Sequence, residues 1–284
     1  MSHIFEALRK SEGLFAEETS APPETLFDVL EKPEELGSVP TEHADIKPES
    51  RLVAWEDKRS LWAERFRYLR IELFKLQATG KLRTLLLTSP SPQDGKSTVS
   101  LNLATTLVGK ENNRILLLES DLRCPSLTGR LGLKAWPGLS ECLEHDENPM
   151  GSVRRIEPFG FFLLPAGRPA HDPTELLQSD RLGEVLQVLA ARFDFVLIDC
   201  APTSPIADTL ALKSKTDAAL LVVRAGKTSR ESIDECIQQL GKGHVLGIIL
   251  NGLAGLEKEY SDYYLKYYGP GSSTAPQARR PNPK

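Results

Sequence analysis

The sequence predicts an α/β fold of three layers, in which helices cover both faces of a mostly parallel central sheet. Apolar runs of strand length alternate along the chain with helical patterns, and these runs have no polar side, as strands buried on both faces require. The chain of 284 residues with 40% hydrophobic content is also long enough to bury one substantial core. In such a fold we expect ligands at the carboxyl ends of the strands.

The chain divides into four segments by composition. Residues 1–15 are predicted to be a short amphipathic N-terminal segment, and residues 16–50, with ten Asp or Glu against two Lys and five prolines, an acidic disordered linker. Residues 51–256 carry the alternating pattern and form the expected folded domain. Residues 257–284 are polar and rich in Pro and Gly at their end, which predicts a flexible tail.

Within the folded domain, strands and helices are expected in alternation. The helical patterns cover residues 97–109, 180–193 and 229–241. The expected strands lie in residues 82–89, 114–120, 159–167, 193–200, 217–226 and 245–253.

The composition argues against several classes of protein. A net charge of −4 without any run of Lys and Arg argues against a nucleic-acid partner. The four cysteines lack the spacing of zinc sites or of a disulfide framework, which fits a reducing cytoplasm. No apolar stretch reaches the roughly 18 residues that cross a bilayer. We therefore expect a cytoplasmic protein that reaches a membrane only through a partner.

The segment TSPSPQDGKST, residues 88–98, has the residues of a phosphate-binding loop. It follows an apolar strand and opens a helix, so its backbone N–H groups can surround phosphates while Lys96 reaches the β and γ oxygens and Ser97 holds magnesium. Pro90 stands where the usual pattern has its first glycine, and a side chain at Gly95 would crowd the phosphates. The alternative is a chance Gly-Lys-Ser at the start of a helix.

Carboxylates follow two of the predicted strands. Glu119 and Asp121 stand at positions i and i+2, which project to the same side of an extended chain, and Asp199 ends a second strand. Buried carboxylates are costly unless a cation meets them, and a magnesium ion beside the phosphate loop would do so. The alternative, that each carboxylate only caps a following helix, suits one of them better than all three. The loop and the carboxylates together predict a P-loop NTPase fold with ATP and Mg²⁺ as ligands.

These motifs resemble those of the bacterial tyrosine kinases of capsule and exopolysaccharide synthesis, the CpsD/CapB-like autokinases built on the MinD/ParA-type P-loop fold. The resemblance runs from about residue 51 to residue 268. In addition to the phosphate loop, the resemblance rests on the segments ESDLRCP, LLPAGRPAHDPTELLQSDRL, FDFVLIDCAP and VLGIILNGL. Two positions depart from the family pattern, because Gln93 replaces a glycine and Glu119 replaces an aspartate.

The resemblance implies a role for each motif residue. Asn251 would face the adenine, and Glu119 takes the place of the carboxylate thought to orient or deprotonate the incoming tyrosine. The extra methylene of Glu119 moves that carboxylate by roughly an ångström, which can cost about 10²-fold in rate. The implied catalytic residues are Lys96, Glu119, Asp121 and Asp199. The implied magnesium ligands are Ser97, Asp121 and Asp199. The implied nucleotide contacts are Ser91, Gln93, Asp94, Gly95, Lys96, Ser97, Thr98, Arg123 and Asn251.

The segment ERFRYLR places Glu64, Arg67 and Arg70 at E-x-x-R-x-x-R spacing, which puts them on one helical face. In the family this helix docks against the neighbouring subunit of an oligomer. The spacing alone fits a solvated ladder of ion pairs equally well.

Five of the six tyrosines fall within nine residues near the end of the chain. By resemblance they are phosphoacceptors that enter the site of an adjacent subunit; the alternative is an aromatic interface patch. They are Tyr260, Tyr263, Tyr264, Tyr267 and Tyr268.

These features predict an ATP- and Mg²⁺-dependent autokinase that phosphorylates its tyrosine cluster between subunits of a ring and regulates exopolysaccharide or capsule synthesis or export. Each phosphate adds a charge of about −1.5 to −2, so modified tails would repel one another and dissolve the ring. A transmembrane chain-length regulator is the expected activator, which would hold the protein at the inner face of the plasma membrane.

Two alternatives stay open. One is a MinD/ParA-like positioning ATPase, although Ser91 stands where such proteins typically carry a second lysine. The other is a catalytically weak nucleotide-binding adaptor of the polysaccharide machinery, which Pro90, Gln93 and Glu119 favour.

Overall fold

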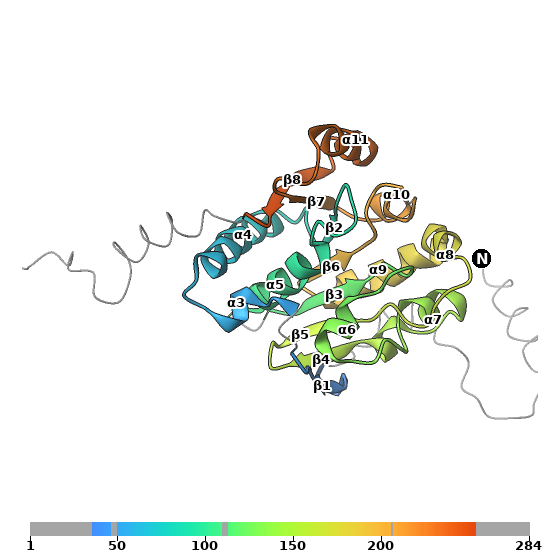
Figure 1. Ribbon diagram of the computed structural model, residues 1–284. Coiled ribbons are helices and arrows are strands. Elements are labelled where there is room, and N and C mark those ends of the chain that lie inside the picture. Colours follow the sequence, from blue (N-terminus) through green and yellow to red (C-terminus); the bar gives the residue numbers. More distant parts are fainter. Residues whose placement is uncertain (1–35, 47–49, 110–112, 206, 254–284) are drawn as a thin grey trace, which may run out of the picture.

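A computed structural model describes residues 36–46, 50–109, 113–205 and 207–253 of the chain. In these ranges one sheet of eight strands runs through the molecule in the order β1-β4-β5-β3-β6-β2-β7-β8 (Figure 1). Neighbouring strands are parallel except β4 and β5, which pair antiparallel. The predicted α/β class with a mostly parallel sheet is confirmed.

The central strands β2, β3 and β6 are buried along their whole length, as their unbroken apolar runs predict. The edge strand β8 instead alternates between half-buried and exposed residues. The strands are β1 (Thr41–His43), β2 (Thr84–Thr88), β3 (Ile115–Glu119), β4 (Arg154–Glu157), β5 (Phe161–Leu164), β6 (Phe195–Asp199), β7 (Ala218–Arg224) and β8 (Val245–Asn251).

Several helices begin at a side chain that accepts a hydrogen bond from the first turn. Ser60 accepts from the N–H of Ala63, and Ser229 accepts from the N–H of Ser232. The α-helices are α3 (Val53–Glu56), α4 (Leu61–Ala78), α5 (Lys96–Val108), α6 (Leu127–Leu131), α7 (Leu139–Glu144), α8 (Pro173–Gln178), α9 (Asp180–Arg192), α10 (Asp208–Lys213) and α11 (Arg230–Leu240), and the short 3₁₀ turns are η2 (Leu36–Ser38) and η4 (Pro149–Ser152).

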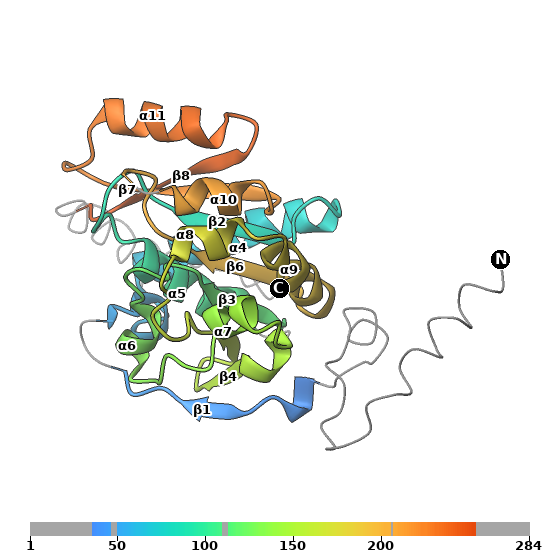
Figure 2. The same cartoon turned by 90° about the vertical axis from the view of Figure 1, so that its right-hand side faces the viewer.

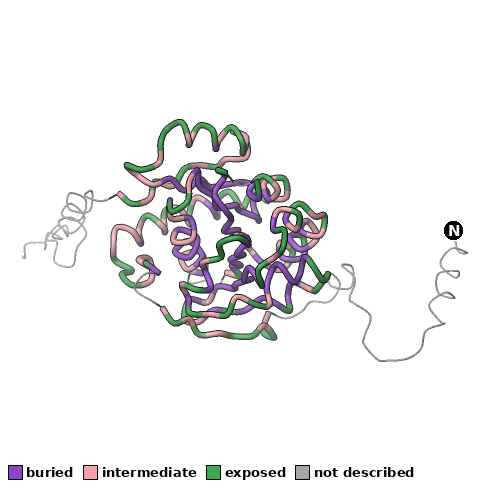
Figure 3. Tube along the Cα trace, turned by 45° about the vertical axis from the view of Figure 1, so that its right-hand side comes forward, coloured by how far each residue is buried: buried purple, intermediate pink, exposed green. Residues whose placement is uncertain are grey.

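The helices form the two outer layers. Buried residues of α4, α5 and α6 share one apolar core with the sheet, and those of α7, α8, α9, α10 and α11 share the core on the opposite face (Figure 2). Figure 3 shows the buried residues gathered along the middle of the molecule, with exposed residues on the outer helices. Among the helices in the described ranges, none combines the length and the apolar character that a bilayer crossing requires.

The prediction of a disordered linker up to residue 50 is wrong for residues 36–46. This stretch forms η2 and the edge strand β1, which pairs in parallel with β4. Main-chain hydrogen bonds from Arg155 N to Pro40 O and from Ala44 N to Glu157 O, both 2.8 Å, hold it on the sheet. An edge strand gains these backbone bonds without an apolar pattern, so acidic composition alone does not exclude it. Ser50, the last residue of the predicted linker, is buried, and its hydroxyl donates to the main-chain oxygen of Arg130 at 2.6 Å. Residues 16–35 and 47–49 of the linker, the first fifteen residues and the tail lie outside the described residues.

Candidate nucleotide site

The phosphate loop, residues 89–95, joins the carboxyl end of β2 to the first residue of α5. Gln93 and Gly95 have positive φ angles of +65° and +99°. A Cβ atom at Gly95 would lie 2.0 Å from Asn251 Nδ2, so the position has no space for a side chain. Gln93 adopts a left-handed conformation that costs a residue with a side chain about 1–2 kcal/mol. This explains why a glycine suits the same position in the family motif.

Asp94 ties this loop to the neighbouring strands. Its Oδ2 accepts a hydrogen bond from Ser91 N at 3.1 Å, and its Oδ1 accepts from Thr228 Oγ1, just after β7, at 2.9 Å. Its main-chain oxygen accepts from Asn251 Nδ2, at the end of β8, at 2.8 Å. Asp94 is 2% exposed, so its side chain fixes the shape of the loop from within the protein.

Lys96, Asp121 and Asp199 lie within electrostatic reach of one another. Burial raises the pKa of both carboxyl groups above their ordinary range, and the charge of Lys96 opposes this rise in each case. Hydrogen bonding with Ser97 and Ser100 also lowers the pKa of Asp199, and Ser100 Oγ lies 2.9 Å from Asp199 Oδ1. The structure therefore brings together the lysine and the two aspartates that the sequence singled out.

Glu119 lies opposite Asp199 in the pairing of β3 with β6, and it is fully buried. Burial raises the pKa of Glu119 to about 6, and the charge of Asp199 adds to this rise while backbone N–H groups oppose it. Glu119 Oε1 accepts hydrogen bonds from the N–H groups of Ser126 at 2.6 Å and Leu127 at 2.5 Å. Its carboxylate thus points at the backbone of the segment that opens α6.

The loop after β3 carries Asp121 and Arg123 to different partners. Asp121 Oδ1 accepts from the N–H of Cys124 at 3.0 Å. Arg123 Nε lies 2.9 Å from Asp208 Oδ2, and its Nη2 donates to Thr174 Oγ1 at 2.6 Å. Arg123, predicted to contact the nucleotide, is therefore held by residues of α8 and α10.

The donors at this site fit a magnesium ion that also binds phosphates. Mg²⁺ in nucleotide sites is commonly held by one or two carboxylates together with phosphate oxygens. Asp121, Asp199 and the hydroxyl of Ser97 supply donors of this kind beside Lys96. In the described ranges no group of three or more Asp, Glu, His or Cys side chains is arranged to hold a metal ion by itself.

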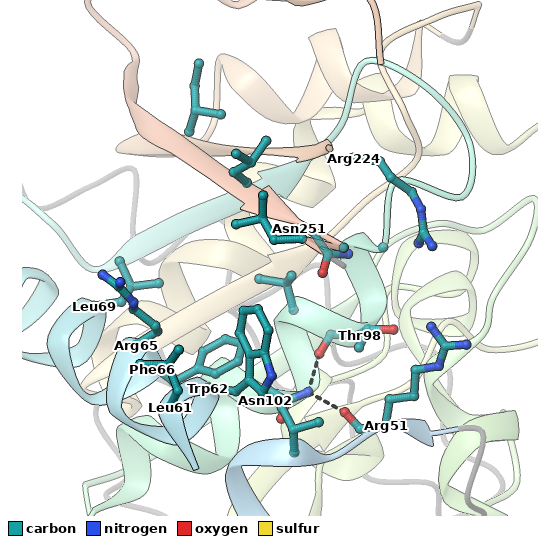
Figure 4. Close-up of a pocket in the computed structure, with 17 residues that line it drawn as sticks. Arg51, Leu61, Trp62, Arg65, Phe66, Leu69, Thr98, Asn102, Arg224 and Asn251 are labelled. Carbon is teal, nitrogen blue, oxygen red and sulfur yellow. Dashed lines mark hydrogen bonds between the residues drawn. The ribbon is translucent and has the colours of Figure 1, made fainter. Parts of the chain in front are cut away.

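A cavity of about 750 Å³ opens beside the phosphate loop, between α4, α5 and β8 (Figure 4). Trp62 and Phe66 of α4 line its apolar side, while Gly95 and Asn251 line the side that adjoins the loop. A cavity of this size with apolar walls and a few polar groups is typical of small-molecule sites.

Asn102 of α5 fixes the lower wall of this cavity. Its Nδ2 donates to the main-chain oxygens of Arg51 at 2.9 Å and Thr98 at 2.8 Å, as the dashed lines of Figure 4 show. Its Oδ1 accepts from the N–H of Ala54 at 2.9 Å. The Thr98 hydroxyl also accepts from Arg130 Nη1 at 3.2 Å, so α5 and α6 are tied beside the loop.

The residues of the E-x-x-R-x-x-R motif lie on α4. Glu64 and Arg67 form an ion pair with each other, and Arg67 also donates to the main-chain oxygen of Lys58. The Arg70 guanidinium lies against Gly109, where a Cβ atom would be 2.6 Å from Nη1. Within one chain, Glu64 and Arg67 thus pair as in the ion-pair interpretation. The tyrosine cluster, residues 260–268, lies outside the described residues.

Ser126 and Asp208 are among the polar residues of the site that sequence reasoning missed. Ser126 Oγ donates to Ser97 Oγ at 2.9 Å, although 29 residues separate them. Asp208, fully buried, holds Arg123. Neither stands at a spacing that indicates a motif, because each contact joins two segments that follow different strands.

No family model matches the chain. The chain is 30% identical over 281 residues to the putative tyrosine-protein kinase EpsB of Ralstonia nicotianae, a match that covers 89% of this chain and 37% of that protein. It is 29% identical over 220 residues to the tyrosine-protein kinase YwqD of Bacillus subtilis, with 77% of this chain and 91% of YwqD covered. The chain thus spans only 37% and 29% of the length of the two EpsB proteins from Ralstonia that it matches.

Among solved structures, the chain is likewise similar to tyrosine kinase domains. The VpsO kinase domain is 30% identical with a TM-score of 0.59, over 68% of this chain and 100% of that domain. The BceF tyrosine kinase domain is 28% identical with a TM-score of 0.64, over 87% of this chain and 97% of that domain. A more distant neighbour, a complex of Cyanothece McdA with ATP, is 21% identical over 66% of this chain and 79% of that chain, with a TM-score of 0.51, and shares the fold alone.

Proposed function

Because this chain belongs to the family of bacterial tyrosine kinases (BY-kinases) linked to capsule and exopolysaccharide synthesis, we propose that it is an ATP-dependent protein-tyrosine autokinase. The observation that carries the proposal is the meeting of Lys96 with Asp121 and Asp199 beside the phosphate loop. Burial raises the pKa of both aspartates even beside the charge of Lys96, so the two carboxylates are costly in the free protein. A site for phosphates and a cation explains why they are there.

The residues of the loop position the γ-phosphoryl group. Lys96 binds phosphate oxygens, and Ser97, Asp121 and Asp199 hold the cation, directly or through water. Bound magnesium neutralises charge on the phosphates. A tyrosine oxygen forms a bond to the γ-phosphorus while the bond from that phosphorus to the β–γ bridging oxygen breaks, and the phenolic proton is released to solvent. The products are ADP and phosphotyrosine, and such transfers need positioning more than a strong base.

The adenosine part of ATP enters the cavity beside the loop. Asn251 lies between the loop and the cavity, so the nucleoside passes its amide, and Trp62 and Phe66 offer aromatic faces to the adenine. Trp62→Ala is expected to raise KM for ATP about tenfold with kcat nearly unchanged, because it removes contacts that substrate and transition state share. Tyr68→Ala, an exposed residue of the same helix outside the cavity lining, is the control and keeps KM. An unchanged KM in Trp62→Ala would contradict the proposed place of the adenine.

The phosphoacceptors in this proposal are the five tyrosines of the tail, Tyr260, Tyr263, Tyr264, Tyr267 and Tyr268. They are phosphorylated between subunits of a ring whose contacts include the α4 residues Glu64, Arg67 and Arg70. A transmembrane chain-length regulator of polysaccharide export activates the kinase and holds it at the inner face of the plasma membrane. The support for these assignments is the family of the chain and the motifs at these positions.

The test is to incubate the full chain with Mg-ATP and to detect phosphotyrosine, with and without the cytoplasmic segment of the regulator. Lys96→Met is expected to lower incorporation by about 10³-fold or more, because the phosphate charge loses its partner. A variant with all five tail tyrosines changed to Phe keeps ATP binding and loses incorporation. ATP hydrolysis without phosphotyrosine would instead indicate a positioning ATPase, and nucleotide binding with neither activity an adaptor.

A further inference from the structure

Donors of the protein itself surround both oxygens of the Glu119 carboxylate. Oε1 accepts from the N–H groups of Ser126 at 2.6 Å and Leu127 at 2.5 Å. Oε2 accepts from the N–H of Ala166 at 3.4 Å and from Thr128 Oγ1 at 3.5 Å. Oε1 therefore has two short hydrogen bonds to the backbone, and Oε2 has two longer contacts with donors. Glu119 is also fully buried, so a substrate hydroxyl has no approach to either oxygen.

The segment that Glu119 holds contacts the phosphate loop. Ser126 donates its N–H to Glu119, and its hydroxyl donates to Ser97 Oγ at 2.9 Å. A continuous path of short contacts thus runs from Glu119 through Ser126 to the hydroxyl that the proposed function assigns to the cation.

We infer that Glu119 is a positioning residue: by binding the backbone of residues 126–127 it orients the Ser126 hydroxyl, which fixes Ser97 for the cation of the nucleotide. This role differs from that of the carboxylate that orients or deprotonates tyrosine, which the family resemblance assigns to this position. Where activity is measured, the inference rests on the proposed function.

The length of the side chain decides between the two roles. An aspartate at this position would end about 1.5 Å earlier, one carbon–carbon bond, and could not reach the N–H groups of Ser126 and Leu127 without a backbone shift. It would still carry a negative charge beside Asp199. A glutamine keeps the reach and can present its oxygen to both short contacts, which turns its amide nitrogen toward the longer contacts with Ala166 N and Thr128 Oγ1. It loses the charge and any capacity to take a proton.

The two substitutions therefore separate the roles. If Glu119 positions Ser126, Glu119→Gln is the mild change and Glu119→Asp the severe one. If Glu119 takes the proton of the tyrosine, Glu119→Asp restores the residue of the family motif and Glu119→Gln abolishes the function. Glu144, exposed on the last turn of α7, gives the matched controls Glu144→Asp and Glu144→Gln.

The first measurement needs neither nucleotide nor activity. In the free protein, amide hydrogen exchange at residues 126 and 127 is expected to be slow. Glu119→Asp accelerates it about tenfold or more, because both N–H groups lose a charged acceptor. Glu119→Gln changes it by less than about threefold.

The second measurement is the affinity for ADP with MgCl₂ and with EDTA. Loss of a hydrogen bond that orients a metal ligand typically lowers metal affinity or activity by about 10- to 100-fold. Glu119→Asp and Ser126→Ala are expected to reduce the magnesium-dependent gain in ADP affinity by about tenfold, and Glu119→Gln by less than about threefold. Ser126→Ala keeps its N–H, so it isolates the contact between hydroxyls.

Three outcomes overturn the inference. One is phosphotyrosine formation that survives in Glu119→Asp and disappears in Glu119→Gln. Another is unchanged amide exchange at residues 126 and 127 in Glu119→Asp, and the third is an unchanged magnesium dependence in Ser126→Ala. If the wild-type chain forms no phosphotyrosine, the proposed function fails, and the exchange and ADP measurements still decide the role of Glu119.

Discussion

The neighbouring strands β3 and β6 carry charged residues at both of their ends, in opposite arrangements. At the amino ends, Arg114 precedes β3 and Asp194 precedes β6, and Arg114 Nη2 lies 2.8 Å from Asp194 Oδ1. The N–H of Arg114 also donates to Asp194 Oδ2 at 2.8 Å. Partial burial acts to raise the pKa of Asp194, but the hydrogen bonds and charge of Arg114 prevail and lower it. This end is arranged for stability.

At the carboxyl ends of the same strands, Glu119 and Asp199 stand opposite each other as like charges. Both are buried, and burial raises the pKa of each. Like charges in a directly opposed pair destabilise a sheet, and the buried ammonium of Lys96 offsets only part of this cost. The difference between the two ends indicates where the functional site lies, because carboxyl groups with perturbed pKa values cluster at functional sites.

The substitution with the largest expected effect on this comparison is Asp199→Asn. Asparagine keeps the shape and removes the charge, so phosphotyrosine formation is expected to fall about 10²- to 10³-fold. The free energy of unfolding of the free protein at pH 7 should stay the same or rise, because the buried carboxylate that the raised pKa marks as costly is gone. The rate of phosphotyrosine formation checks the first expectation, and urea unfolding checks the second.

Asp194→Asn is the control at the other end of β6. It weakens the contact with Arg114 and is expected to lower the free energy of unfolding by about 1 kcal/mol, with phosphotyrosine formation unchanged. If both variants lost activity equally, or if Asp199→Asn were the less stable of the two, the contrast between the ends of the strand would be wrong.

A smaller effect is expected from pH in the protein without nucleotide or metal. The pKa of Glu119 is about 6 against an ordinary value of 4.5, so between these values the folded state binds more protons than the unfolded state. Stability therefore decreases as pH rises through this window, by about 2 kcal/mol for this group.

The measurement is the difference in free energy of unfolding between wild type and Glu119→Gln at several pH values from 4 to about 7. Glutamine does not titrate, so the stability of the wild type relative to the variant should fall across the window. A difference that stays constant with pH would show that Glu119 titrates normally in the folded protein.

The sequence by itself determined most of the central sheet and the phosphate loop. Strands β2, β3 and β6 follow from unbroken apolar runs, and the loop follows from a Gly-Lys-Ser at the start of a helix. The prediction that Asp121 and Asp199 meet near Lys96 also follows from sequence, because parallel strands end at one edge of a sheet. These features depend on residues that are neighbours in the chain or on rules that hold for every parallel sheet.

Only the tertiary structure decided what the residues between these elements do. Strand β1 has no apolar pattern and exists because β4 offers it backbone partners. The Glu119 carboxylate could point toward the nucleotide or toward the backbone of α6, and the path of the loop after β3 selects the backbone. Ser126 reaches Ser97 across 29 residues, and Arg123 reaches Asp208 across 85. Side-chain periodicity encodes which face of an element is buried, whereas the partner of a buried polar atom depends on the loops that pack around it.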